Sequence, residues 1–293
     1  MKSIGIVTDS HCGMTEEEAK RLGVRVLPMP FYINNECFLE GVSLSREAFF
    51  EKLASDAAVS TSQPSPADVM ALWDDALNEY EQILYMPISS GLSGSCSTAT
   101  ALAMDEPYEG RVHVVDNGRV SALLHCSILD ALELIEEGYS AAEIKKILED
   151  ARADMVIYIG VETLEHLKRG GRISPATASL GTLLNIKPVL KFDVGNLDTY
   201  QKCRGMKKAR AAMIEVMKKE LETRFAESYQ NKEIYLLAAS SADQEGIDSW
   251  VAQIKEAFPD LDVLYDDLSL GLCCHIGQGG LGIGCSCKPK RPR

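Results

Sequence analysis

The stretch QILYMPISSGLSGSCSTAT, residues 82–100, begins as an apolar strand and continues toward a helix. The apolar run from Ile83 to Ile88 stops at two serines and a glycine, and a helix is predicted from about Ser93. A strand that leads directly into a helix is the repeating unit of α/β folds. The first N–H groups of such a helix lack partners and carry partial positive charge. Hydroxyls and glycines at this junction therefore indicate an anion-binding turn.

The kind of anion follows from what the turn lacks. It contains no Gly-Lys-Ser/Thr sequence, so it is not a phosphate-binding P-loop. The spacing around Ser93 also matches neither GxGxxG nor the GxSxG nucleophile elbow. Without a lysine in the turn, a singly charged group held by hydroxyls and amides is favoured over a triphosphate.

The rest of the N-terminal half repeats this alternation. We predict strands at 4–7, 24–27, 82–88 and 112–115, helices at 15–22, 45–53, 66–80 and 140–153, and a hairpin at Asn34-Asn35. This order predicts a mostly parallel sheet flanked by helices over residues 1–154. Polar loops follow three of the strands, at residues 8–10, 89–95 and 116–118. Because parallel strands end at one edge of a sheet, these loops are expected to converge there.

The C-terminal half has a different pattern. A strand at 155–161 precedes a hairpin of 187–192 and 197–202, a long helix at 205–225, a strand at 233–239, a helix at 244–257 and a strand at 261–264. This order predicts an α+β domain with a mainly antiparallel sheet over residues 155–287, closing over the ligand. We expect residues 288–293, which are rich in Lys, Arg and Pro, to form a disordered basic tail.

Composition narrows the classes of partner. The 293 residues carry a net charge of −13, which disfavours binding to nucleic acid. No apolar run is long enough to span a bilayer, and the N-terminus does not look like a secretory signal, so a cytoplasmic protein is expected. Nine scattered cysteines fit a reducing compartment better than a disulfide framework. The basic tail leaves transient membrane contact open.

One cysteine cluster needs separate consideration. Cys273, Cys274, His275, Cys285 and Cys287 resemble metal ligands, but their spacing lacks the paired C-x₂₋₄-C pattern of a zinc site. We interpret the cysteines as small apolar residues of a strand and its exit loop, and we expect no metal site and no cofactor.

Two further features are candidates for the anion site. Thr61 and Ser62 lie upstream of Ser65, the predicted N-cap of the next helix, so capping does not explain their hydroxyls. His275 begins a glycine-rich segment, HIGQGGLG, and is a candidate hydrogen-bond donor. We expect the two hydroxyl-bearing loops and this histidine to form a binding site for a carboxylate.

Seven segments, in order along the chain, resemble the DegV family of fatty-acid-binding proteins. They are IGIVTDS (4–10), TSQPSPAD (61–68), ISSGLSGS (88–95), ETLEHLKRGGRIS (162–174), LLNIKPVL (183–190), RGMKKA (204–209) and HIGQGGLG (275–282). The resemblance implies that one long-chain fatty acid is enclosed between an α/β and an α+β domain. It places the carboxylate on Thr61, Ser93 and the Gly94 amide, with His275 beside them.

The same resemblance implies a partner. In many bacteria, members of the family present the carboxylate of the bound fatty acid to a separate ATP-dependent fatty acid kinase, which makes acyl phosphate for phospholipid synthesis. Arg172 and Arg204 match basic positions expected to meet the kinase, and Lys168 and Arg169 extend that patch. On this reading the chain is a binding subunit without catalytic residues of its own. The loops at residues 10–13 and 116–119 depart from the family pattern.

Two other functions remain open at this stage. Ser93 and His275 resemble the first two members of a hydrolase triad, so an acyl hydrolase is one alternative. No third member is evident in the sequence, and no nucleophile elbow holds the serine. A lipid-sensing interaction module without a kinase is the other alternative.

Overall fold

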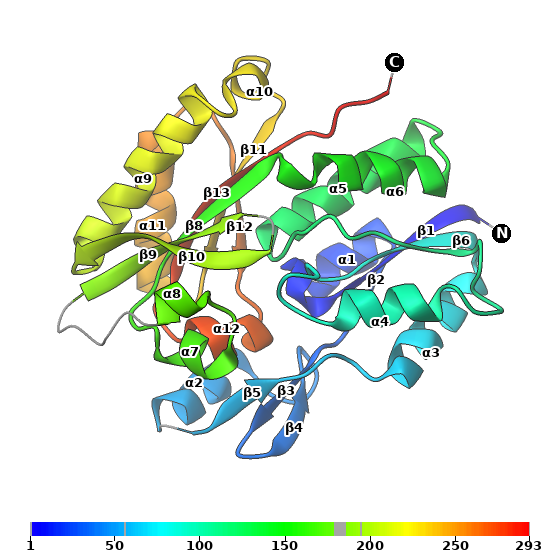
Figure 1. Cartoon of the computed structure of the whole chain (residues 1–293), viewed down its shortest axis with the longest axis horizontal. Coiled ribbons are helices and arrows are strands. Elements are labelled where there is room, and N and C mark those ends of the chain that lie inside the picture. Colours follow the sequence, from blue (N-terminus) through cyan, green and yellow to red (C-terminus); the bar gives the residue numbers. More distant parts are fainter. Residues whose placement is uncertain (1, 56, 179–185, 194, 293) are drawn as a thin grey trace.

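Three β-sheets organise the chain (Figure 1). The computed structural model describes residues 2–55, 57–178, 186–193 and 195–292. All strands of the first two sheets precede residue 155, and all strands of the third follow residue 154. The boundary near Asp154 between two domains remains our interpretation of this arrangement. Among the described residues, no helix has both the length and the apolar character needed to cross a membrane.

The parallel sheet has the strand order β2-β1-β6-β7, and every pair in it is parallel. Its strands are β1 (Lys2–Asp9), β2 (Val24–Leu27), β6 (Tyr80–Met86) and β7 (Val112–Val114). Successive residues of β6 enter different cores, since Leu84 packs with one face of the sheet and Tyr85 with the other. The predicted parallel sheet is confirmed.

Helices cover both faces of this sheet. The helices α1 (Glu16–Leu22), α5 (Ala122–Glu136) and α6 (Ala141–Asp150) pack on one face, and α3 (Pro66–Leu77) and α4 (Ser95–Leu102) pack on the other. Short 3₁₀ helices η1 (Ser10–Cys12) and η2 (Ala151–Ala153) complete this half. Thr15, Ser65 and Ser140 cap α1, α3 and α6 through their side chains, which confirms the predicted N-cap at Ser65. The helix predicted from Ser93 instead begins at Ser95.

The second sheet is small and antiparallel, with the order β4-β3-β5. Its strands are β3 (Pro30–Ile33), β4 (Glu36–Leu39) and β5 (Val59–Thr61), and α2 (Arg46–Ala54) lies between β4 and β5 in the chain. The predicted hairpin is confirmed, because Asn34 and Asn35 both have positive φ, at 51° and 68°. The third strand was not predicted. It places Thr61 at the end of a strand rather than in a loop.

The third sheet has the order β10-β9-β8-β13-β11-β12 and is antiparallel except for the β11–β12 pair. Its strands are β8 (Met155–Gly160), β9 (Ile186–Asp193), β10 (Asn196–Arg204), β11 (Ile234–Ser240), β12 (Val263–Asp267) and β13 (Leu281–Cys287). The expectation of a mainly antiparallel sheet is confirmed. Val194 of the predicted hairpin turn and Leu183 to Asn185 of one family segment lie outside the described residues.

Helices of the C-terminal half occupy two positions around this sheet. The helices α9 (Met206–Glu222) and α11 (Gln244–Ala257) cover one face together (Figure 1). The shorter helices are α7 (Glu165–Gly170), α8 (Pro175–Ala178), α10 (Ala226–Gln230) and α12 (Leu270–Ile276). Of these, α7 and α12 lie between the small sheet and the third sheet (Figure 1). This position brings the C-terminal half against the loops of the N-terminal half.

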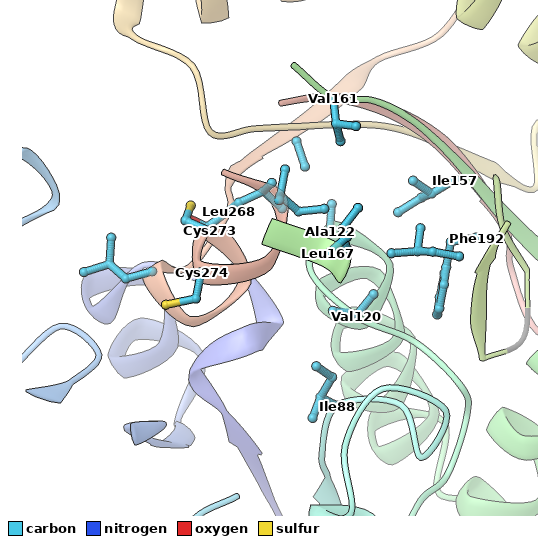
Figure 2. Close-up of a cluster of buried hydrophobic side chains, with 14 of the residues drawn as sticks. Ile88, Val120, Ala122, Ile157, Val161, Leu167, Phe192, Leu268, Cys273 and Cys274 are labelled. Carbon is cyan, nitrogen blue, oxygen red and sulfur yellow. The ribbon is translucent and has the colours of Figure 1, made fainter. Parts of the chain in front are cut away.

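A buried apolar cluster joins the two halves (Figure 2). Ile88 and Val120 come from the loops of the parallel sheet, and Ile157 and Phe192 come from the third sheet. Burial of such side chains, at about 25 cal/mol per Å² of apolar surface, stabilises the contact between the halves. The cluster also contains the cavity described below.

Two sequence interpretations need correction. Cys273 and Cys274 lie on α12, not in a strand, although they are buried as expected. The tail, expected to be disordered, has defined partners as far as Arg291. Lys288 contacts the carboxylate of Glu133 at 2.8 Å, and Arg291 forms ion pairs with Glu133 and Glu137 on α5.

Candidate functional site

The three polar loops converge at the carboxyl end of the parallel sheet, as predicted. Asp9, at the end of β1, accepts hydrogen bonds from the backbone N–H groups of His11, at 3.0 Å, and Ile88, at 2.8 Å. Burial raises the pKa of Asp9 to about 6. A buried carboxyl group thereby holds the loop after β1 against the loop after β6.

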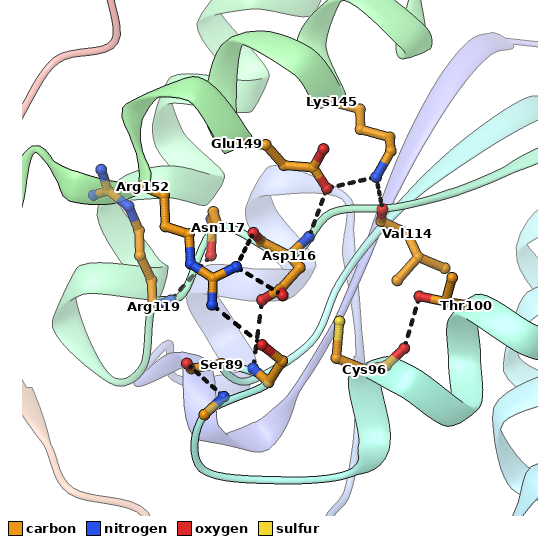
Figure 3. Close-up of polar contacts among 12 residues, drawn as sticks. Ser89, Cys96, Thr100, Val114, Asp116, Asn117, Arg119, Lys145, Glu149 and Arg152 are labelled. Carbon is orange, nitrogen blue, oxygen red and sulfur yellow. Dashed lines mark hydrogen bonds and ion pairs between the residues drawn. The ribbon is translucent and has the colours of Figure 1, made fainter. Parts of the chain in front are cut away.

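A second set of contacts fixes the base of the serine-rich loop (Figure 3). Arg152 donates from Nη1 to the Asp116 carboxylate, at 2.9 Å, and from Nη2 to the Ser90 hydroxyl, at 3.2 Å. The N–H of Gly91 donates to the Ser89 hydroxyl at 3.2 Å. The side chains of Ser89 and Ser90 therefore stabilise the loop, and Ser93 is left to face a pocket.

A polar pocket forms where the loops meet the small sheet and α12. Five of the predicted site residues line it, and these are Thr61, Ser62, Ser93, Arg172 and His275. They come from four segments that are far apart in the sequence: the end of β5, the loop before α4, the segment after α7, and α12. We call this cavity the polar pocket.

His275 and Thr61 interact directly. The Nε2 atom of His275 lies 2.8 Å from Oγ1 of Thr61, within hydrogen-bond distance. Burial, with a smaller contribution from Arg172, lowers the pKa of His275 to about 4. The imidazole is therefore neutral at physiological pH, and its Nδ1 is buried without a partner among the described residues.

Arg172 supplies positive charge to the polar pocket. Its Nε donates to the carbonyl of Leu92 at 3.2 Å, and its Nη1 donates to the carbonyl of Gly170 at 2.5 Å. Of the described residues that line this pocket, Arg172 is the one with a formal charge, since burial also lowers the pKa of His11 to about 4. A neutral histidine, hydroxyls and one guanidinium suit a single anionic group.

Gly94 lies beside the polar pocket as the N-cap residue of α4. As a glycine, Gly94 has no side chain to cap this helix, but the Ser93 hydroxyl accepts from the N–H of Ser95 at 3.2 Å. A Cβ atom at Gly94 would lie 3.0 Å from Oε1 of Gln63, so the absence of a side chain brings the two loops close together.

The position of α12 depends on groups that sequence reasoning missed. The carboxylate of Glu40 accepts from the N–H groups of Leu270 and Gly271, at 2.9 and 3.0 Å. The Ser269 hydroxyl lies 2.7 Å from Nδ1 of His11, and His11 also lines the polar pocket. The departure of residues 10–13 from the family pattern was the one sequence signal that pointed toward His11.

An apolar pocket adjoins the polar one. Both are lined by Leu92, Leu197, Leu272 and Ile276, and the apolar pocket continues between the start of α5 and strands β8, β9, β11 and β13. The residues that line it carry almost only aliphatic side chains or none, such as Ile157, Ala239 and Gly282. One end of the combined cavity therefore suits an anion, and the other suits a hydrocarbon.

The remaining basic residues lie outside both pockets. Lys168 and Arg169 are in the last turn of α7, and Arg204 ends β10 and is exposed. Only Arg172 of the predicted kinase-contact residues lies at the polar pocket. In the part of the chain that the structure describes, no group of three or more His, Cys, Asp or Glu residues is arranged to hold a metal ion.

Comparison with known proteins agrees with this architecture. The family model described as "Uncharacterised protein, DegV family" matches residues 3–288. The chain belongs to the DegV family. A DegV domain-containing protein of Deinococcus radiodurans is 32% identical over 285 residues, which cover 96% of this chain and 97% of that protein.

Solved DegV-family structures share the whole fold. A Thermus thermophilus DegV family protein, described as binding fatty acid, superposes with a TM-score of 0.86 at 33% identity, over 97% of this chain and 99% of its own. DegV of Bacillus subtilis, described as a fatty acid binding protein, has a TM-score of 0.84 at 26% identity, over 98% and 100% of the two chains. The fold predicted from the sequence is therefore that of the DegV family.

Proposed function

We propose that the chain binds one long-chain fatty acid, with the carboxylate in the polar pocket and the hydrocarbon in the apolar pocket. The observation that carries the proposal is the shared wall between a pocket suited to an anion and an almost wholly apolar one. Thr61, Ser62 and Ser93 contribute hydroxyls, the Gly94 amide lies beside them, and His275 orients Thr61. The fatty-acid-binding DegV proteins of Thermus and Bacillus support this choice of ligand.

The two pockets are expected to contribute differently to the free energy of binding. About 14 buried methylene groups contribute roughly 11 kcal/mol at ~0.8 kcal/mol each. Association costs about 4–15 kcal/mol in lost freedom of motion. A hydrogen bond to a carboxylate adds about 1.5–3 kcal/mol. The apolar pocket therefore supplies most of the affinity, and the polar pocket positions the carboxylate.

We further propose that the protein presents this carboxylate to a separate ATP-dependent fatty acid kinase in the cytoplasm, which forms acyl phosphate for phospholipid synthesis. The sequence has no phosphate-binding P-loop at its anion-binding turn, so the phosphoryl donor is assigned to the partner. We assign the kinase contact to the basic residues Lys168, Arg169, Arg172 and Arg204, on a chain whose net charge is −13. Local positive charge of this kind favours an acidic partner surface and speeds association.

Reconstitution with a cognate kinase, ATP and a long-chain fatty acid tests this proposal. We expect acyl phosphate only when both proteins are present. The exposed charge reversals Arg169→Glu and Arg204→Glu are expected to reduce its formation about tenfold without changing fatty-acid affinity. Lys255→Glu, an exposed reversal on α11, is the matched control and is expected to have no effect.

Two results of the reconstitution would contradict the kinase proposal. One is an active kinase that makes no acyl phosphate with the loaded protein. The other is a reaction that the reversals leave unchanged. Fatty-acid binding without kinase stimulation favours the lipid-sensing module instead.

The acyl hydrolase alternative is less well supported by the geometry. Within the described residues, His275 Nε2 contacts Thr61, and the Ser93 hydroxyl accepts from the Ser95 N–H. Among the residues that the structure describes, no carboxylate contacts His275 Nδ1, which is where the third member of a triad would bind. Turnover of a chromogenic acyl ester that is lost in Ser93→Ala would revive this alternative, and no turnover by the wild type would end it.

A further inference from the structure

One polar side chain interrupts the lining of the apolar pocket. Among the described residues that line this pocket, Ser121 is the one with a side-chain hydroxyl. It is 3% exposed and lies between Val120 and Ala122, which pack in the same buried cluster as Ile157 and Phe192 (Figure 2). The Ser121 hydroxyl has no hydrogen-bond partner among the described residues. A buried hydroxyl without a partner is costly and calls for an explanation.

Helix capping does not explain this serine. Ser121 is the N-cap residue of α5, a position where a serine hydroxyl ordinarily accepts from the first turn, but its side chain makes no such bond. The backbone is satisfied without it. The Ser121 N–H donates to the carbonyl of His11 at 2.7 Å, and its carbonyl accepts from the N–H groups of Leu124 and His125, at 2.8 and 3.0 Å.

Backbone conformation does not explain it either. Ser121 has φ 53° and ψ −140°, a region in which residues with a side chain are strained and glycine is not. A glycine here would relieve the strain and remove the buried hydroxyl at once. Neither helix capping nor backbone conformation therefore accounts for the serine.

A buried water is a poor partner for the hydroxyl. An ordered internal water usually makes about three hydrogen bonds to polar groups. The side chains around Ser121 in the pocket, such as Val120, Ala122 and Leu268, offer none. A ligand oxygen carried into the pocket on a hydrocarbon chain needs no such additional partners.

We propose that Ser121 forms a subsite for an oxygen atom carried partway along the acyl chain. The ligands of this protein then include long-chain fatty acids with a mid-chain hydroxyl or oxo group. The inference rests on the proposed function, because it requires the hydrocarbon to occupy the apolar pocket. In an apolar pocket, a chain hydroxyl without a partner would weaken binding, whereas one paired with Ser121 satisfies two buried groups together.

Competitive binding of stearic acid and of hydroxystearic acids with the hydroxyl at successive carbons tests the subsite. For the wild type we expect at least one hydroxy isomer to bind as tightly as stearic acid or more tightly. Ser121→Ala is expected to weaken that isomer about tenfold while stearic acid stays within about twofold. Ser121→Gly removes the hydroxyl and relieves the backbone strain, so it is expected to fold and to show the same loss.

Ser95→Ala is the matched control. Ser95 is also a buried serine with an unpartnered hydroxyl at a helix start, but it lines neither pocket. Its substitution is expected to leave the ratio of the two affinities unchanged.

Three outcomes overturn the inference. If Ser121→Ala and Ser121→Gly keep the wild-type ratio, or if the wild type binds stearic acid but disfavours every hydroxy isomer more than tenfold, the subsite is absent and fatty-acid binding stands. If neither stearic acid nor any hydroxy acid binds the wild type, the proposed function fails and the subsite fails with it.

Discussion

The polar pocket and the apolar pocket share four side chains but are built from different parts of the fold. The polar groups lie at ends of elements and in loops: Thr61 ends β5, Ser93 precedes α4, and His275 is in the last turn of the short helix α12. The apolar lining lies largely within strands and at the start of α5, as with Ile157 and Ala239. The carboxylate position thus depends on a few contacts between distant segments, whereas the hydrocarbon pocket depends on general packing.

The largest expected effect comes from filling the apolar pocket. Ala239→Leu adds volume equal to about three methylene groups and is expected to exclude that much of a long chain. The predicted loss is about 2.4 kcal/mol, roughly 60-fold in Kd, with a much smaller loss for an acid short enough to leave this region empty. Calorimetric titration with a series of chain lengths measures both.

The control for this substitution lies on the other face of the sheet. Ala212→Leu on α9 makes the same change in the separate core of the C-terminal half and is expected to leave affinity unchanged, whatever it does to stability. Equal losses for short and long acids in Ala239→Leu would show that the hydrocarbon does not occupy the apolar pocket.

A smaller effect is expected in the polar pocket. Thr61→Ala and Ser93→Ala each remove one hydroxyl, and each is expected to weaken binding about tenfold, because one hydrogen bond to a carboxylate contributes about 1.5 kcal/mol. The loss should be the same for every chain length, in contrast to Ala239→Leu. Titration with a fatty acid and with its methyl ester separates the contribution of the carboxylate from that of the hydrocarbon. The affinity for the ester should fall less than the affinity for the acid in both alanine variants.

A steric change at the shared wall tests the contact between the two halves. A Cβ atom at Gly91 would lie 2.2 Å from the Cα of Gly195, in the turn between β9 and β10. Gly91→Ala is therefore expected to separate the loop that carries Leu92 from that turn and to speed ligand release about fivefold, as overpacking commonly costs 1–3 kcal/mol. Stopped-flow displacement measures the rate. Ser97→Ala, an exposed change on the following helix α4 that leaves this backbone contact intact, should release ligand at the wild-type rate.

The smallest expected effect is a change in acid stability. Burial lowers the pKa of His275 to about 4, below its usual 6.5, so the unfolded chain binds a proton that the native state does not between these values. Stability from this residue is present above about pH 6.5 and is lost as the pH falls toward 4. Between pH 7 and pH 5, the free energy of unfolding of His275→Gln is therefore expected to fall by about 1 kcal/mol less than that of the wild type. Urea unfolding at the two pH values measures this difference.

A second buried histidine provides a contrast for that measurement. The carboxylates of Asp266 and Glu18 lie 3.0 and 3.4 Å from the ring nitrogens of His125, whose pKa is raised despite its burial. Its stabilising contribution is present below pH 6.5 and is lost at higher pH, the opposite sign to that of His275. An NMR titration in which both imidazoles titrate at the same pH would contradict the difference between these environments.

The sequence was most informative where local chemistry is strong. The N-cap at Ser65, the Asn34-Asn35 turn and the apolar strand cores predicted the elements, the two types of sheet and the convergence of the loops. The predicted set Thr61, Ser62, Ser93 and His275 meets in one pocket. These features were predictable because each depends on a few neighbouring residues or on the rule that parallel strands end together.

The remaining features depend on tertiary contacts that no local pattern encodes. The segment from Leu270 to Ile276 is short and apolar on nearly all sides, so periodicity did not distinguish a buried helix from a strand. The residues of the apolar pocket have the same composition as an ordinary core. From the sequence, Arg172 was predicted to be a basic residue that contacts the kinase. Its hydrogen bond to the carbonyl of Leu92 forms only when the segment after α7 and the loop before α4 come together in the fold.

Native mass spectrometry of the freshly purified chain, followed by solvent extraction and lipid analysis, tests the central claim most directly. We predict a mass increase of one long-chain fatty acid per chain and recovery of that acid in the extract. A chain that carries no lipid, and that takes up no fatty acid when one is offered, would contradict the account.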